Sequence, residues 1–251
     1  MTARSAADPS AEYYERFPKR LNRRNFEHYF ARRWSAVRRA APDAAAAPGR
    51  VLELGCGEGH GLRALARAAG EAPATVVGLD YAWTMVRSAA ADPGLRGRVL
   101  QADAAAVPFG EGSFDLVYSN ALLHHIPDAE RAVAEALRVC RPGGAVVFVE
   151  PNRWHPLMIA YGVLDRAERG TLRFSRRRLE RRLRSDPRVG EVSVRPLNTF
   201  LYSYRGFPPA RLFPLVRRIE RLFDLPHVAS QWLFVARRRA RSTPRTSTAG
   251  C

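Results

Sequence analysis

The stretch VLELGCGEGHG at residues 51–61 sets an apolar run containing one carboxylate, Glu53, directly before a glycine-rich turn. An unbroken apolar run is typical of a strand buried on both faces. Glycines at 55, 57 and 59 let the backbone adopt positive φ and approach a ligand closely, and the N–H groups that begin a helix attract anionic groups. The stretch therefore predicts a strand, a turn and a helix start, with a ligand beside the turn.

The glycine spacing differs from that of a dinucleotide-binding turn, which requires G-x-G-x-x-G/A directly after the strand. In the register that starts at Gly55 and Gly57, His60 stands where the third small residue should be. A second register, which starts at Gly59, begins five residues beyond the strand and is interpreted as chance. The glycines alone therefore do not identify the ligand.

Apolar strand segments and helical patterns alternate along residues 50–150. The strand candidates are RVLEL (50–54), TVVGL (75–79), RVLQA (98–102), DLVYS (115–119) and AVVFVE (145–150). This alternation, with strands apolar throughout, indicates an α/β fold: a Rossmann-like, doubly wound, mostly parallel sheet covered on both faces. Such sheets bind ligands at the carboxyl ends of their strands, near the switch point.

Acidic residues lie at the ends of three successive strand candidates. Glu53 places a carboxylate at the glycine turn, where it repels a pyrophosphate and attracts an ammonium or sulfonium group. Asp80 is placed to accept hydrogen bonds from ribose hydroxyls, and Asp103 to accept one from an adenine amine. A ligand with a cationic amino acid part, a ribose and an adenine would use all three. The alternatives are a helix cap for Glu53 and a turn acid for Asp80.

Longer motifs carry a resemblance to a known family. They are ELGCGEG (53–59), GLDYAWTM (78–85), QADAAAVPFGEGSFDLVYSNALLHHIPD (101–128) and RVCRPGGAVVFVEPN (138–152). These motifs resemble the class I S-adenosylmethionine-dependent methyltransferases, most closely their broad small-molecule, type 11-like branch. The resemblance implies S-adenosyl-L-methionine as cofactor and seven strands, the last reversed and inserted beside the fifth. EVSVRPL (191–197) and QWLFVAR (231–237) can fill the sixth and seventh places.

The resemblance also implies roles for single residues. It places the methionine part of the cofactor beside Glu53, Gly55, Gly57 and Asn120, the ribose beside Asp80, and the adenine beside Tyr81, Asp103 and Ala104. His125 and His155 are the candidate catalytic bases, although the LHH stretch often has a packing role in this family. Methyl transfer from a sulfonium depends on alignment, which supplies about 7 to 11 kcal/mol, and a base matters only for a poor nucleophile.

Charge and composition bound the remaining possibilities. The 251 residues carry a formal net charge of +17, of which residues 1–40 contribute +6, residues 41–150 contribute −4 and residues 151–251 contribute +15. Three widely spaced cysteines predict neither a disulfide framework nor a metal site. The first residues contain no apolar signal segment, and the run at 156–164 is too short to span a bilayer. We expect a cytoplasmic protein of bacterial secondary or envelope metabolism.

The domain organisation follows from these segments. We expect an N-terminal helical cap at 1–47, a methyltransferase domain at 48–237 and a disordered basic tail at 238–251. The domain contains insertions at about 153–174 and 204–228, with an apolar helix in the first and a basic amphipathic helix in the second. A basic helix with Leu179 and Leu183 inward follows the first insertion.

The two insertions lie on the side of the predicted sheet where the methyl acceptor is expected to bind. Each is apolar on one face and rich in arginine. They predict a small-molecule or lipid-like acceptor that carries an acidic group or is presented at an anionic membrane surface; a solvated arginine face is the alternative. A nucleic acid partner fits the sequence pI of about 11.1, but no NPP[YF]-type stretch follows the fourth strand. A cofactor-binding protein without transfer activity is a third alternative. The methylated element and the oligomeric state stay open.

Overall fold

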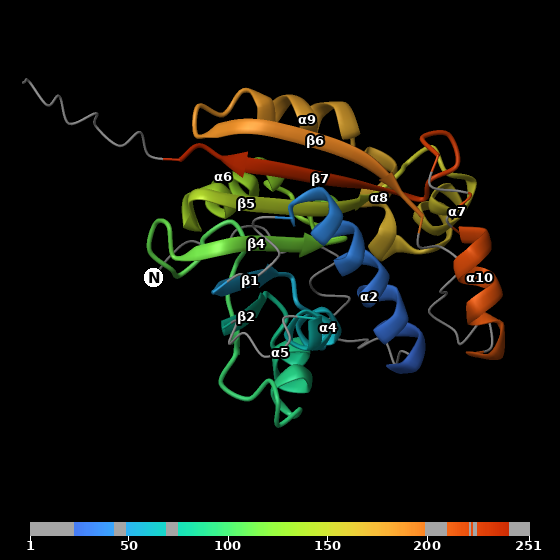
Figure 1. Cartoon of the computed structure of the whole chain (residues 1–251), viewed down its shortest axis with the longest axis horizontal. Coiled ribbons are helices and arrows are strands. Elements are labelled where there is room, and N and C mark those ends of the chain that lie inside the picture. Colours follow the sequence, from blue (N-terminus) through green and yellow to red (C-terminus); the bar gives the residue numbers. More distant parts are fainter. Residues whose placement is uncertain are drawn as a thin grey trace, which may run out of the picture.

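The computed structural model describes residues 23–42, 49–68, 75–198, 210–220, 222 and 225–240 (Figure 1). Two parts of the expected N-terminal cap, 1–22 and 43–47, lie outside the described residues, as do 241–251 of the expected tail and 204–209 of the second insertion.

Seven strands form one sheet within the described residues. The strands are β1 (Arg50–Leu54), β2 (Thr75–Asp80), β3 (Val99–Gln101), β4 (Phe114–Asn120), β5 (Cys140–Pro151), β6 (Val189–Leu197) and β7 (Gln231–Arg238). Their order is β3-β2-β1-β4-β5-β7-β6, and β7 runs antiparallel to both β5 and β6 while the other pairs are parallel. This confirms the predicted doubly wound sheet with a reversed last strand beside the fifth.

Helices cover both faces of this sheet (Figure 1). The described α-helices are α2 (Arg23–Ala40), α4 (His60–Ala68), α5 (Trp83–Ala90), α6 (Ala129–Val139), α7 (Pro156–Leu164), α8 (Gly170–Arg173), α9 (Arg176–Arg184) and α10 (Phe213–Glu220). Short 3-10 helices are η1 (Leu123–His125), η2 (Arg166–Glu168) and η3 (Ala210–Leu212). One apolar cluster joins α6 and α9 to the sheet, and a second joins α2, α4 and α5 to it. Burial on both sides explains why the strands read as unbroken apolar runs.

Two helices match expectations from the sequence. Leu179 and Leu183 of α9 are buried, as their spacing predicts. The helix α2 supplies the predicted N-terminal helical segment, and its fully buried Arg33 donates a hydrogen bond to the side chain of Gln231 at the start of β7. The guanidinium of Arg33 also lies 3.6 Å from the ring centre of Tyr29, so a charged residue docks this helix.

The fifth strand begins earlier than its apolar run suggests. The prediction placed a turn at RPGG and a strand at 145–150, whereas β5 starts at Cys140, which pairs with Phe114. A register shift between Phe114 and Leu116 accommodates these residues within the strand. A Cβ at Gly144 would lie 2.6 Å from the carbonyl oxygen of Asp115, so only glycine permits this approach of the two backbones.

The reversed β7 brings both insertions to one edge of the sheet. Pro151 at the end of β5 and Leu197 at the end of β6 both pair with Gln231, the first residue of β7. The chain therefore leaves β5, leaves β6 and enters β7 at the same edge. Figure 1 shows α7, α8 and α10 at this edge, the one towards which β4 points.

Candidate functional site

The glycine turn after β1 forms the first part of the site. Gly55 and Gly57 have φ values of 69° and 52°, in the left-handed region that favours glycine. A Cβ at Gly55 would lie 2.7 Å from a methyl group of Leu122, whereas a Cβ at Gly57 would meet nothing within 4 Å. The turn is therefore packed on one side and open beside Gly57, where a ligand can approach the backbone.

Glu53 is a buried acid at the end of β1. Its residue is 2% exposed, and its Oε2 has no hydrogen-bond partner. Burial and, after it, the negative charge of Asp80 raise the pKa of Glu53 well above its ordinary value, against the opposing charge of Arg63. A cation beside this carboxylate would restore the ionised form, because opposite charge stabilises it.

Asp80 ties the glycine turn to the end of β2. Its Oδ2 accepts a hydrogen bond from the N–H of Gly57 at 2.8 Å, and its Oδ1 accepts one from Ala82 at 3.0 Å. Asp80 thus holds the turn in place, a role additional to the predicted ribose contact.

The predicted adenine-side residues lie at the ends of β2 and β3. Tyr81 is 53% exposed directly after β2, and Gln101 at the end of β3 donates a hydrogen bond to its carbonyl oxygen at 3.0 Å. Asp103 accepts a hydrogen bond at Oδ1 from the N–H of Ala105 at 2.8 Å, and Ala104 between them is buried. The structure therefore brings an exposed aromatic ring and a fixed acid to neighbouring strand ends.

The end of β4 carries a second buried oxygen without a partner. Oδ1 of Asn120 is buried and accepts no hydrogen bond. Ala121, the next residue, has a φ of 54°, which a residue with a Cβ adopts only at an energetic cost. Its N–H donates to the carbonyl oxygen of Val149 at 2.7 Å, which holds this strained turn. Because β4 neighbours β1, Asn120 and Glu53 lie at adjacent strand ends.

Glu150, a residue that the sequence reasoning missed, organises the segment after β4. This fully buried carboxylate accepts hydrogen bonds from the N–H groups of Leu122 at 3.0 Å and Leu123 at 2.8 Å, and pairs with Nδ1 of His124 at 2.8 Å. Burial disfavours the charged imidazolium, but Glu150 and Glu168 outweigh it through hydrogen bonds and charge and raise the pKa of His124 to about 9.

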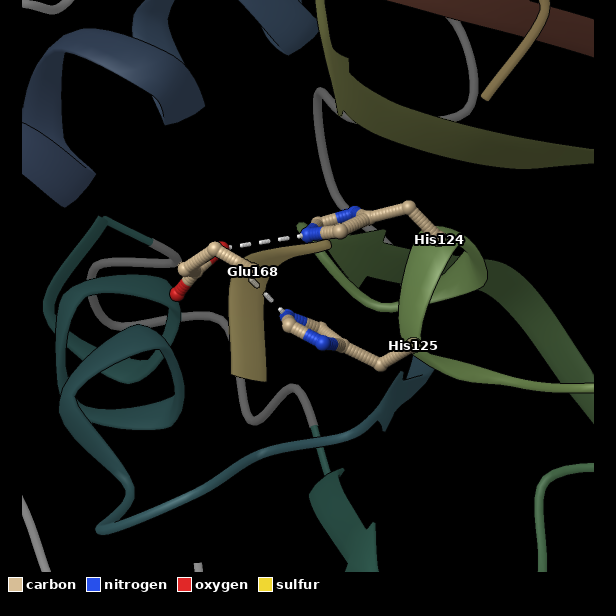
Figure 2. Close-up of side chains that lie close together, drawn as sticks. All are labelled: His124, His125 and Glu168. Atoms are coloured by element: carbon tan, nitrogen blue, oxygen red, sulfur yellow. Dashed lines mark ion pairs between the residues drawn. The ribbon is translucent and has the colours of Figure 1, made fainter. Parts of the chain in front are cut away.

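Glu168, also missed, brings the first insertion against both histidines of η1 (Figure 2). Its Oε2 lies 3.5 Å from Nε2 of His124 and 3.8 Å from Nε2 of His125. The two imidazole rings lie with their centres 3.9 Å apart. A Cβ at Gly170 would lie 1.7 Å from the carbonyl oxygen of His124, so the insertion approaches η1 as closely as glycine allows.

His155 occupies a different place from His125. It precedes α7, and its Nδ1 accepts a hydrogen bond from the N–H of Leu157 at 3.3 Å, which caps that helix. Burial lowers the pKa of His155, which favours the neutral imidazole. The two predicted bases therefore come from separate elements, His125 from η1 and His155 from the start of the insertion.

Comparison with known proteins identifies the family. A family model described as a methyltransferase domain, of type 11, matches residues 52–148. A phosphatidylethanolamine N-methyltransferase of Cereibacter sphaeroides is 33% identical over 171 residues, which are 65% of this chain and 81% of that protein. The chain belongs to the class I S-adenosylmethionine-dependent methyltransferases, in the type 11 branch, whose cofactor is S-adenosyl-L-methionine.

Two further relatives show how far the similarity extends. A demethylmenaquinone methyltransferase of Thermus thermophilus is 42% identical over 124 residues, 47% of this chain and 54% of that protein. A phosphoethanolamine N-methyltransferase 2 of Haemonchus contortus, solved with S-adenosyl-L-methionine, shares the fold with a TM-score of 0.62 at 19% identity, over 94% of this chain and 61% of that one. The chain spans 39% to 54% of the length of the first four curated relatives it matches.

Proposed function

We propose that this protein transfers the methyl group of S-adenosylmethionine to a lipid-like acceptor presented at a membrane surface. The observation that carries the cofactor part is the pair of buried, unpartnered oxygens on Glu53 and Asn120 at adjacent strand ends. A buried polar atom without a partner costs about 1 to 3 kcal/mol. The cationic amino acid part of S-adenosylmethionine would donate hydrogen bonds to both atoms, so Glu53 and Asn120 fit this cofactor.

The other predicted cofactor residues complete the proposed site. The open side of Gly57 would admit the methionine part, with Gly55 keeping the turn tight. Asp80 would accept hydrogen bonds from the ribose hydroxyls. The exposed ring of Tyr81 would stack on the adenine, and Asp103 with Ala104 would hold the adenine edge. When bound, the cofactor supplies an electrophilic methyl group.

The chain's own contribution to the reaction would be alignment and, for a weak nucleophile, a base. His125 is the proposed base, and Glu168, close to its Nε2, would orient it. His155 is the alternative, but the neutral imidazole that caps α7 through the lone pair of Nδ1 carries its proton on Nε2, so a base role would require the cap to be released. An acceptor that is already a good nucleophile, such as an uncharged amine, needs neither.

The proposed acceptor rests on where apolar surface is exposed. Among the described residues, thirteen large hydrophobic residues are exposed, and eleven of them lie between residues 154 and 228. They include Leu164 of α7 at 83% and Leu215 of α10 at 56%. Exposed arginines accompany them: Arg166, Arg169, Arg173, Arg211 and Arg218. Apolar side chains rimmed by cations suit an anionic lipid surface.

Membrane attachment would be peripheral. No helix among the described residues combines the length and apolar character needed to cross a bilayer. We expect the protein to sediment with vesicles of anionic lipid at low salt, and the double variant Leu164→Ser, Leu215→Ser to bind them at least about tenfold more weakly. Equal failure to bind anionic and neutral vesicles would remove the membrane part of the proposal and leave methyl transfer standing.

Calorimetric titration tests the cofactor. We expect S-adenosylmethionine and S-adenosylhomocysteine to bind and NAD not to bind. Glu53→Gln should weaken binding of S-adenosylmethionine by about 10- to 150-fold. This factor is equivalent to the 1.5 to 3 kcal/mol that a hydrogen bond to a charged group contributes. Glu130→Gln, the same change at an exposed position of α6, is the matched control. Wild-type affinity in Glu53→Gln would contradict the assigned role.

The acceptor is then sought by mass spectrometry of methylated products. Similarity to a phosphatidylethanolamine N-methyltransferase makes an amino-phospholipid in mixed vesicles the first acceptor to test, and similarity to a demethylmenaquinone methyltransferase makes a prenylated quinol the second. A protein that binds the cofactor but methylates neither, nor any lipid extract, would contradict the lipid part of the proposal.

A further inference from the structure

We propose that His124, His125 and Glu168 form a binding site for a divalent transition-metal ion of the zinc class. Two imidazoles and one carboxylate are the ligand set that zinc, cobalt and ferrous iron share in proteins. The three residues come from η1 and η2, so a bound ion would link the first insertion to the segment after β4. This inference is independent of the proposed methyl transfer itself, but it conflicts with the base role proposed for His125.

The distances suit an ion after movements of the three side chains. One ligand atom from each residue can be chosen so that all three lie within 4.8 Å of one another. Oε2 of Glu168 lies 3.5 Å and 3.8 Å from the Nε2 atoms of His124 and His125. An ion with bonds of about 2.0 to 2.2 Å holds its ligand atoms roughly 3 to 3.5 Å apart. The two Glu168 contacts need shifts of only a few tenths of an ångström, whereas the two imidazole nitrogens, which lie within 4.8 Å of each other, would have to approach by up to roughly 1.3 to 1.8 Å.

Glu150 provides a second, independent observation. Metal-binding histidines usually donate their other ring N–H to a carboxylate, which fixes the ring orientation and increases the basicity of the ligand nitrogen. The buried Glu150 contacts Nδ1 of His124 in this way and is itself held by two backbone N–H groups. Nε2 of His124 consequently faces Glu168, as Figure 2 shows. The chain thus contains both the ligands and the group that orients one of them.

Burial leaves a path of entry. The side chain of His124 is 2% exposed, that of His125 is 11% exposed and that of Glu168 is 20% exposed. Three protein ligands leave at least one position of the ion open, which suits a water molecule or an oxygen donor of a bound molecule. Metal binding and the proposed base role for His125 exclude one another: Nε2 must be unprotonated to bind the ion, whereas it must carry its proton to donate to Glu168 while Nδ1 acts as the base. The competing explanation is an ion pair of protonated His124 with the two carboxylates.

Cobalt(II) absorption tests the site. Protein without a purification tag is freed of metal by dialysis against EDTA and titrated with Co²⁺ while the visible ligand-field bands are recorded. We expect saturation at one ion per chain. His125→Ala and Glu168→Gln should each weaken binding at least about tenfold, whereas His227→Ala, which removes an exposed histidine before β7, should not. Variants that bind Co²⁺ as tightly as the wild type, or a wild type that does not saturate, would overturn the proposal in favour of the ion pair.

A measurement on the unaltered chain covers the case in which a variant fails to fold. X-ray absorption of the zinc-loaded wild type should show two imidazole nitrogens at about 2.0 to 2.1 Å. Thiolate scattering, or fewer than two imidazoles, would overturn the assignment. Neither measurement involves the cofactor, so a chain that binds metal but not S-adenosylmethionine would refute the proposed function alone, and the reverse result would refute only the metal site.

Discussion

Replacing Glu150 by glutamine tests whether one buried carboxylate organises the segment after β4. The carboxylate accepts two backbone hydrogen bonds and pairs with His124. In the variant the amide oxygen can still accept both backbone N–H groups, but each bond falls from the charged to the neutral range, a loss of about 1 kcal/mol each. The amide NH₂ would face Nδ1–H of His124, so the third bond, about 1.5 to 3 kcal/mol, is lost. We expect a total loss of about 3.5 to 5 kcal/mol in the free energy of unfolding, similar to the cost of breaking a buried ion pair.

Urea unfolding followed by circular dichroism and tryptophan fluorescence measures this loss. Glu130→Gln is the matched control, because Glu130 pairs with Arg178 at 2.5 Å with both side chains more than half exposed, and such pairs contribute less than about 1 kcal/mol. Combining Glu150→Gln with His124→Asn completes a double-mutant cycle that isolates the pair. A loss below about 1 kcal/mol, or one equal to that of Glu130→Gln, would refute the reasoning.

Three further experiments test the residues around the proposed cofactor site at the ends of β1 and β4. The raised pKa of Glu53 means that a cationic ligand must displace a proton, so affinity for S-adenosylmethionine should rise with pH and level off above the pKa of Glu53 in the ligand-free protein. Calorimetry should find no such slope in Glu53→Gln. Gly61→Ala would place a Cβ 2.1 Å from Oε1 of Glu53, so affinity for S-adenosylmethionine should fall at least about tenfold. The thermal midpoint should be kept, because alanine favours the helix. Affinity equal to that of the wild type would contradict the packing of Gly61 against Glu53. Ala121→Gly should leave the free energy of unfolding unchanged or raise it by about 1 kcal/mol, because it relieves the strain at φ 54°. The control Ala134→Gly within α6 should lower it by about 1 kcal/mol. Equal losses in both variants would show that the turn at Ala121 is unstrained.

The sheet and the placement of three acids at the ends of its strands could be predicted because their signals are local. Each strand is an apolar run, and Glu53, Asp80 and Asp103 lie at or directly after the ends of three such runs, so topology alone brings them to one edge. What the pattern could not give is the second role of Asp80, whose bond to Gly57 joins residues 23 positions apart. Hydrogen bonds of this range leave no periodicity in the sequence.

The cluster around η1 lies beyond sequence reasoning for the same reason. Glu150 and His124 are separated by 26 positions, and Glu168 belongs to an insertion whose path no pattern defines. Ala121 is hidden differently, because positive φ is normally signalled by glycine and here an alanine adopts it. A carboxylate at the end of the buried run AVVFVE was the one available signal, since a buried acid requires partners.

The antiparallel insertion of β7 explains why the two halves of the proposed site share one edge. If β7 ran parallel to β5, the connection from β6 would have to cross the sheet, and its helix would cover a face. Because β7 is reversed, the chain leaves β6 and enters β7 at the edge where β5 ends, and α10 of this connection lies at the same edge as α7 and α8 (Figure 1). The first four strands would then supply the proposed cofactor residues, while the connections from β5 to β6 and from β6 to β7 lie together at the end of the sheet. The exposed apolar residues of α7 and α10 occupy these connections, so the acceptor is proposed from them and the cofactor from β1 to β4.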